Sequence, residues 1–300
     1  MNNNRREFLK QLGVGALGLT ALQGLPLESL ATKKKLFFKI SLAEWSLHRT
    51  LREGKLTNMQ FPETAAKKFG INAVEYVNGF FKDKALDFKY LSELNQRAKD
   101  NDVANILIMV DGEGNLADAN QKERDKAVEN HYKWVEAAKF LGCHTIRVNA
   151  AGKGTPEEMK NAAIESLGRL SEFADVHGIN VVVENHGGLS SDGKWLSSVL
   201  AGVSMKNCGS LPDFGNFYEY DRYQGVIDLM PFAKGVSAKS NDFAANGDES
   251  KIDYVRMLKI VKDAGYRGHI GIEYEGNNLS EEEGIHATKK LLEKVGRQLS

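Results

Sequence analysis

From Leu36 onward, the hydrophobic residues follow two alternating patterns. Short apolar runs, typical of strands buried on both faces, alternate with amphipathic stretches in which apolar residues recur at helical spacing. Several amphipathic stretches end in a glycine, as a helix C-terminus favours, at Gly70, Gly142, Gly178 and Gly265. The predicted strands are FFKISLAEWS (37–46), NAVEYV (72–77), VANILIMV (103–110), HTIRVNA (144–150), INVVVEN (179–185), GSLPDF (209–214), GVSAKS (235–240) and HIGIEYEG (269–276).

Eight strands, each followed by a helix or by a segment long enough to hold one, predict a parallel sheet closed into a (β/α)8 TIM barrel. A doubly wound open sheet is the alternative. It normally carries a phosphate-binding loop, and neither GxGxxG nor GxxxxGK[ST] occurs in the chain. Because no repeat beyond this unit and no linker divides residues 32–300, we predict a single domain there.

The first 31 residues have a different character. Arg5 and Arg6 precede a stretch rich in Gly, Ala and Leu, too short to span a bilayer stably, and small residues follow near Ala31. The segment resembles a twin-arginine export signal, which predicts a mature protein that starts near Thr32 and lies in the periplasm. An amphipathic N-terminal helix of the folded domain is the alternative. With no lipobox cysteine after the signal, we expect no membrane attachment beyond export itself.

Composition narrows the class of protein. The 300 residues carry 40 basic and 40 acidic side chains and 42% hydrophobic residues, as expected of a globular protein with a sizeable core. This balance lacks the basic excess of a nucleic-acid binder, so we expect no nucleic-acid partner. Cys143 and Cys208 lie in apolar runs, where a core role is expected and a disulfide is the alternative.

Three of the predicted strands end in a carboxylate directly after a buried run, at Glu184, Asp213 and Glu273. In a TIM barrel, the C-terminal ends of the strands build the active site. Each acid alone can have a structural role, but three on one rim would repel one another without a positive partner. A divalent cation supplies that charge. Carboxylate and amide ligands favour Mn²⁺ or Mg²⁺, and Zn²⁺ or Co²⁺ become candidates if an imidazole joins.

His186 lies two residues beyond Glu184, on the same face of the strand, so we expect it to point toward whatever binds the metal. The alternative is a loop histidine bonded to the backbone. Gly187 and Gly188 then let the loop turn away without placing a side chain in the pocket.

The endings VVVENHGG, LPDFGNF and GIEYEG resemble the xylose-isomerase-like barrel superfamily, in particular exported proteins described as sugar phosphate isomerase/epimerase-like. The resemblance covers the chain after residue 35. Ketose 3-epimerases of this family hold one divalent metal with Glu, Asp, His and Glu, and the resemblance assigns three of these roles to Glu184, Asp213 and Glu273. The histidine does not carry over, because Val236 to Ser240 reads VSAKS where the family has V-H-x-K-D, so Ser237 stands at the imidazole position.

Two residues near this departure are candidates to compensate for it. Asn241 can offer an amide oxygen as the fourth ligand, or Lys239 can bind substrate oxygens or replace part of the positive charge. The metal's fourth ligand and its identity therefore stay open.

The resemblance also implies a reaction, in which two metal-bound carboxylates, here Glu184 and Glu273, remove and return a proton on the carbon beside a sugar carbonyl. The expected hydroxyl-binding groups are Arg147, Asn149, His186 and Asn216, and the expected apolar wall under the sugar ring is Trp45 with Phe80 and Phe81.

The predicted function is thus a metal-dependent sugar isomerase or epimerase with a small carbohydrate substrate. A lyase acting on 3-keto-glycosides with the same metal and base is second, and a non-catalytic carbohydrate-binding barrel is third. The superfamily's endonuclease branch is last, since it uses a histidine-rich three-metal site and a basic groove. Relatives often dimerise, so the resemblance also allows a homodimer.

Overall fold

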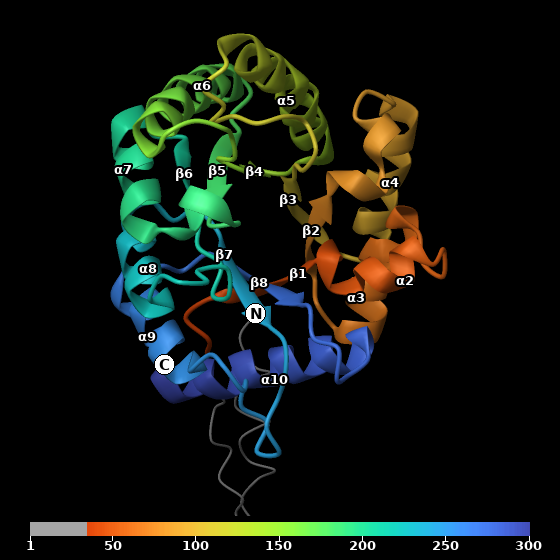
Figure 1. The fold of residues 1–300 in the computed structure, drawn as a ribbon. Helices are drawn as coiled ribbons and strands as arrows, with labels where there is room; N and C mark the ends of the chain where they lie inside the picture. The colour runs from red at the N-terminus through yellow and green to blue at the C-terminus, as the bar shows by residue number, and fades with distance from the viewer. Residues whose placement is uncertain (1–34) are drawn as a thin grey trace, which may run out of the picture. The chain divides into compact units, whose positions relative to one another are not determined.

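The computed structural model describes residues 35–300, which lie within one compact unit. The expected export signal, residues 1–31, and the domain boundary predicted near residue 32 lie outside the described residues. Within 35–300 the predicted TIM barrel is confirmed, because eight strands are joined by segments that carry helices, and the helices surround the strands (Figure 1).

All eight predicted strands are present and lie within the expected ranges or within one residue of them. Neighbours pair in parallel in the order β6-β5-β4-β3-β2-β1-β8-β7. Isolated parallel bridges, Ser210 to Ala233 and Asp213 to Ser237, link the two edges, so the barrel closes beside Asp213. The strands are β1 (Lys39–Ala43), β2 (Ala73–Val77), β3 (Ala104–Met109), β4 (Thr145–Val148), β5 (Asn180–Glu184), β6 (Cys208–Leu211), β7 (Val236–Ser240) and β8 (His269–Tyr274).

Helix boundaries follow local sequence signals. The longer helices α6 and α10 each begin at a capping box, Thr155 with Glu158 and Ser280 with Glu283. The α-helices are α2 (His48–Arg52), α3 (Phe61–Phe69), α4 (Phe88–Asp100), α5 (Gln121–Leu141), α6 (Pro156–Val176), α7 (Gly193–Val203), α8 (Arg222–Leu229), α9 (Tyr254–Asp263) and α10 (Glu281–Leu299). Short 3-10 helices are η1 (Glu44–Leu47), η2 (Asn58–Gln60), η3 (Asn78–Phe80), η4 (Lys82–Lys84), η5 (Gly188–Ser191) and η6 (Met230–Phe232).

Strand alternation sorts side chains between two cores. In β5, Val181 and Val183 pack with the helices in the main core, whereas Val182 belongs to a smaller cluster on the opposite face, inside the barrel. The same alternation turns Glu184 inward. Burying a valine contributes about 1.5–3 kcal/mol, so a register slip that exchanged the two faces would be costly.

Both cysteines take the predicted core role, since Cys143 and Cys208 are buried and unpaired. Within residues 35–300, no helix is both long and apolar enough to cross a membrane.

Candidate metal centre and active site

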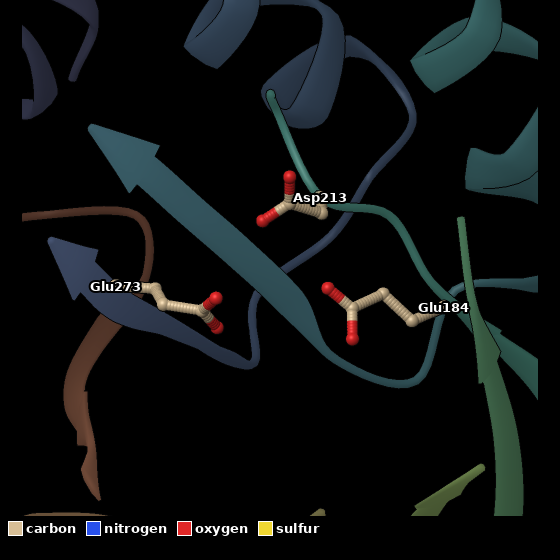
Figure 2. A group of neighbouring side chains, drawn as sticks. All are labelled: Glu184, Asp213 and Glu273. Carbon is tan, nitrogen blue, oxygen red and sulfur yellow. The ribbon is translucent and has the colours of Figure 1, made fainter. Parts of the chain in front are cut away.

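Three carboxylates converge at the C-terminal end of the barrel. Glu184 is the last residue of β5, Glu273 lies near the end of β8, and Asp213 follows β6 by two residues. One oxygen of each lies within 4.8 Å of the other two, and the side chains are almost completely buried. Figure 2 shows the three carboxylates directed toward a common space. The structure therefore brings together the three acids that the strand endings singled out.

Asp213 is held by hydrogen bonds on both its backbone and its side chain. The amide of Asn185 donates to the Asp213 carbonyl (3.0 Å) and accepts from the Asp213 N–H (2.8 Å). The backbone N–H groups of Gly215 and Asn216 donate to Asp213 Oδ1, at 2.8 and 2.9 Å. Asp213 Oδ2 remains directed at the Ser237 hydroxyl, which donates to it at 2.7 Å. The orientation of this carboxylate is therefore set before any ligand binds.

Lys239 places a buried ammonium beside these acids. It donates a hydrogen bond to Glu273, and its Nζ lies 3.1 Å from Glu275 Oε2 and 4.0 Å from Asp213 Oδ2. Gly215 makes room for the lysine stem, because a Cβ there would lie 2.5 Å from Lys239 Cγ. The glycine in the sequence PDFGN is thus required for the approach of this loop to β7.

Arg147 supplies the second buried cation. Its Nε lies 2.9 Å from Glu184 Oε2, and its Nη1 donates to Asp111 Oδ1 at 2.6 Å. The Asn149 amide donates to the same Asp111 oxygen at 2.7 Å. Arg147 and Asn149, which we expected to bind sugar hydroxyls, are therefore tied to Asp111 at the edge of the carboxylate group. Their role toward a substrate stays a prediction.

Burial and the two cations set different pKa values for the three acids. Burial raises the pKa of Glu184 well above its usual value, although Arg147 opposes the shift. Burial also raises the pKa of Asp213, to about 6, against the opposing charge of Lys239. At Glu273, burial acts in the same direction, but the charge and hydrogen bond of Lys239 outweigh it and lower the pKa. Two neighbouring carboxyl groups whose pKa values are shifted in opposite directions are suited to acid and base chemistry.

The charges and donors at this site fit a divalent cation. Five carboxylates share the two cations: Lys239 pairs with Glu273, Asp213 and Glu275, and Arg147 pairs with Glu184 and Asp111. Glu184 Oε2 is buried and takes part in no hydrogen bond among the described residues. Negative charge in excess of the two cations favours an oxygen-binding cation, even though Glu184 Oε2 already lies 2.9 Å from Arg147 Nε. Glu184, Asp213 and Glu273 are the residues that would hold it.

The Ser237 hydroxyl lies inside the carboxylate group, donating to Asp213 and, at 3.4 Å, to Glu273 Oε2. The position matched to the family's histidine therefore faces the site. Asn241, the other candidate ligand, uses its backbone N–H to contact Glu249 at 3.3 Å, and in residues 35–300 no hydrogen bond joins its side chain to the three acids. The fourth ligand stays a prediction.

Two further predicted residues lie at the mouth of the site. The Asn216 amide donates to Glu184 Oε1 at 3.3 Å, which brings this residue into the group. His186 is exposed, and the described part of the chain offers its ring no hydrogen bond. Desolvation by the surrounding protein lowers the pKa of His186, and the charge of Arg147 lowers it further. His186 is therefore a neutral ring at neutral pH, open to the solvent side.

Of the residues expected to form the apolar wall, Phe81 lies elsewhere, and the role of Trp45 and Phe80 toward a sugar stays a prediction. Trp45 donates its ring N–H to Glu275 and lies 6.2 Å from Phe80, measured between ring centroids. Phe81, in contrast, is buried in the main core against Tyr76 and Trp134. Phe81 is therefore part of the core and does not form a wall of the site.

Comparison with known proteins places the chain in a family. The family model for the xylose isomerase-like TIM barrel matches residues 64–295. The chain belongs to the xylose isomerase-like TIM barrel family.

One relative of this xylose isomerase-like barrel is the uncharacterised protein MJ1188 of Methanocaldococcus jannaschii. The two sequences are 26% identical over 246 residues, an alignment that covers 76% of this chain and 89% of the relative. The chain also has a shorter match to the C-glycoside deglycosidase alpha subunit of Arthrobacter globiformis. This match is 36% identical over 67 residues and covers 21% of this chain and 19% of the relative.

Solved structures share the fold. A D-tagatose 3-epimerase-like protein superimposes with a TM-score of 0.67 at 21% identity, covering 88% of this chain and all of that one. The IOLI protein, solved with a bound zinc atom, superimposes with a TM-score of 0.71 at 16% identity, covering 87% of this chain and 99% of that one.

Three residues of this xylose isomerase-like site have contacts that the sequence did not predict: Asn185, Asp111 and Glu275. Asn185 clamps the backbone of Asp213, and the two acids share the charges of Arg147 and Lys239. Each follows the apolar run of a predicted strand, which was the available signal. The partner that each residue contacts depends on how the strands pair. The sequence of a single strand does not reveal that pairing.

Proposed function

We propose that this protein is a divalent-metal-dependent sugar isomerase or epimerase that removes a proton from the carbon beside a carbonyl group. The observation that carries the proposal is the pair Glu184 and Glu273, two buried carboxyl groups that face a common space and have pKa values shifted in opposite directions. The similarity in fold to a D-tagatose 3-epimerase-like protein supports the same class of reaction.

Each acid has a role that follows from its surroundings. Glu273 is held as a carboxylate by Lys239, so it accepts the proton from the substrate carbon. Glu184, on the facing side of the same space, is the group that returns a proton to the substrate carbon. Asp213 is clamped by Asn185 and keeps its orientation throughout. The positive charges of Lys239 and Arg147 stabilise negative charge that develops on substrate oxygens.

A divalent cation held by Glu184, Asp213 and Glu273 would polarise the carbonyl group and stabilise the charge that forms on its oxygen. With three carboxylate donors and a hydroxyl at position 237, the site favours Mn²⁺ or Mg²⁺ over Zn²⁺ or Co²⁺, which prefer a nitrogen ligand.

We further propose that the protein acts in the periplasm, on the strength of Arg5, Arg6 and the apolar segment that follows them. Phosphorylated sugars are scarce there, and the sequence carries no phosphate-binding loop. The proposed substrate is therefore an unphosphorylated sugar, native or oxidised.

The test is proton exchange in D₂O. The purified protein is analysed for metals and then incubated, with Mn²⁺ or Mg²⁺ supplied, with a panel of ketoses and 3-keto-glucosides. We expect about one metal ion per chain, as a single site of this kind binds, and deuterium on the carbon beside the carbonyl. A protein that holds no metal and exchanges no proton would contradict the proposal and favour a carbohydrate-binding barrel.

A second candidate is a lyase that expels the group attached to the carbon next to the deprotonated one. The observation that favours it is the short match to the C-glycoside deglycosidase alpha subunit. The same experiment separates the two, because an epimerase returns an inverted sugar and a lyase releases the leaving group and an unsaturated ketone.

A further inference from the structure

Tyr218 combines a strained backbone with an exposed ring. Its φ angle is 46°, in the left-handed region that is costly for a bulky side chain, and 74% of the residue is exposed. The other described non-glycine residues with positive φ have an ordinary explanation, since Ser204 caps the C-terminus of α7 and Asp102 lies just after α4. Tyr218 instead lies in the loop between β6 and α8, on the face of the barrel that carries the three acids.

The residues on either side of Tyr218 hold it in this conformation. Phe217 is buried, and its ring packs so closely on Gly225 that a Cβ there would lie 2.1 Å from it. Tyr220 donates its hydroxyl to Asp228 at 2.7 Å, and its N–H donates to the Phe217 carbonyl at 2.8 Å. The loop is thus anchored on both sides of a ring that points outward. Strained residues that are held in place by their surroundings cluster at binding and catalytic sites.

A cavity of about 410 Å³ lies next to this ring, between the loop after β5 and the loop after β6. Both loops leave the C-terminal ends of their strands, so the cavity lies at the end of the barrel that carries the three acids. The helices that follow these loops, α7 and α8, are neighbours (Figure 1). Its walls are Gly188, Ser191, Asp192, Phe217, Tyr218, Glu219 and Tyr220.

The cavity is linked directly to the carboxylate site. Ser191 lines the cavity, and its hydroxyl donates to the Asn216 carbonyl at 2.6 Å. Asn216 in turn donates its amide to Glu184 at 3.3 Å. Gly188, on the same wall, is two residues from His186. Asn216 therefore lies between the three acids and this cavity.

We propose that this cavity is a subsite for a second sugar ring, so that the substrate is a glycoside and not a free monosaccharide. The inference rests on the proposed function and names its substrate class. The Tyr218 ring offers a flat apolar face to the C–H side of a sugar, with a polar hydroxyl at its edge. Asp192 caps α7 through one oxygen, and its other oxygen takes no hydrogen bond within the described residues. Together with Glu219 it offers acceptors for sugar hydroxyls.

The test compares binding of paired sugars by titration calorimetry, without turnover. The probes are trehalose, cellobiose, maltose and sucrose, each set against glucose, with Mn²⁺ present. We expect at least one disaccharide to bind the wild-type protein more tightly than glucose by about tenfold, a difference of about 1.4 kcal/mol. Tyr218→Gly should abolish that preference and leave glucose affinity unchanged.

The variants are chosen so that folding does not decide the result. Glycine suits the positive φ of residue 218, so Tyr218→Gly should unfold at the same temperature as the wild type or higher. Tyr218→Phe keeps the ring and should keep most of the preference. Ser204→Gly relaxes a positive φ away from the cavity and should leave the preference intact.

Equal binding of disaccharide and glucose, no sugar binding at all, or a preference that survives in Tyr218→Gly, would overturn the subsite. Failure of the proposed function looks different, because it appears as absent deuterium exchange in a protein whose sugar binding is measured separately. A disaccharide preference without exchange would keep the subsite and reject the isomerase.

Discussion

The ammonium of Lys239 donates a hydrogen bond to Glu273, inside the same group of carboxylates that would hold a divalent cation. Unit charges about 4 Å apart interact by roughly 4 kcal/mol at an effective dielectric constant near 20, so this ammonium and a bound cation repel each other strongly. In the proposed metal site Lys239 would therefore limit metal affinity, while without metal its charge compensates that of Glu273.

Replacing Lys239 by methionine should tighten Mn²⁺ binding by at least about tenfold, or about 1.4 kcal/mol, because the competing charge is gone. Without metal the variant should melt at a lower temperature, since Glu273 loses its partner in a buried site. Titration calorimetry and thermal denaturation with and without Mn²⁺ measure both effects. Lys133→Met, which breaks a 2.9 Å pair with Glu113 elsewhere, is the matched control. Unchanged metal affinity in Lys239→Met would contradict the competition.

Replacing Ser237 by histidine places an imidazole between Asp213 and Glu273, where the hydroxyl now lies. Zn²⁺ and Co²⁺ accept nitrogen ligands readily, so their affinity should rise by about 10- to 100-fold, and the preference for Mg²⁺ or Mn²⁺ should weaken. The absorption spectrum of the Co²⁺ form gives a readout that is independent of activity. Ser237→Ala serves as control, because it removes the hydroxyl without adding a ligand. If the two variants bind Co²⁺ alike, residue 237 does not contribute a ligand.

Metal binding should weaken as the pH falls through about 6. Above its pKa of about 6 Asp213 is a carboxylate and can bind a cation, and below it a proton occupies the same oxygens. The pKa of Glu184 is also raised well above its usual value, so a cation that binds this carboxylate competes with a proton there too, and binding should release protons into the buffer. The number of protons released can be measured by titration calorimetry of metal binding in buffers with different enthalpies of protonation. An affinity that does not change between about pH 7 and about pH 5 would be inconsistent with these shifts.

The sequence predicted the barrel well because strand alternation and helix ends are local features. Val181 to Val183 followed by Glu184 already indicates a strand with apolar residues on both faces and an inward acid at its tip. The convergence of Glu184, Asp213 and Glu273 then followed from the fold, because parallel strands bring their C-terminal ends to one rim.

What the sequence left undetermined depends on contacts between distant segments. Whether Lys239 binds substrate or pairs with Glu273 depends on the pairing of β7 with β8. Phe81 was assigned to the pocket and lies in the core, because the direction of a loop side chain depends on what packs beneath it. The conformation of Tyr218 follows from the anchoring of its neighbours, and no motif announces it.

The most direct test of the account is epimerisation and deuterium exchange by Glu184→Gln and Glu273→Gln, each started from either epimer of a substrate that the wild-type protein turns over. Both variants should fold and lose epimerisation by roughly 100-fold to 10,000-fold, the usual contribution of a general acid or base. Each variant keeps one of the two carboxylates. It should therefore still exchange deuterium into one epimer, namely the epimer whose proton faces that remaining carboxylate. Glu113→Gln, at a buried acid that accepts from Lys133 and Trp134, should match the wild type. Near-normal epimerisation in either site variant would contradict the two-carboxylate mechanism.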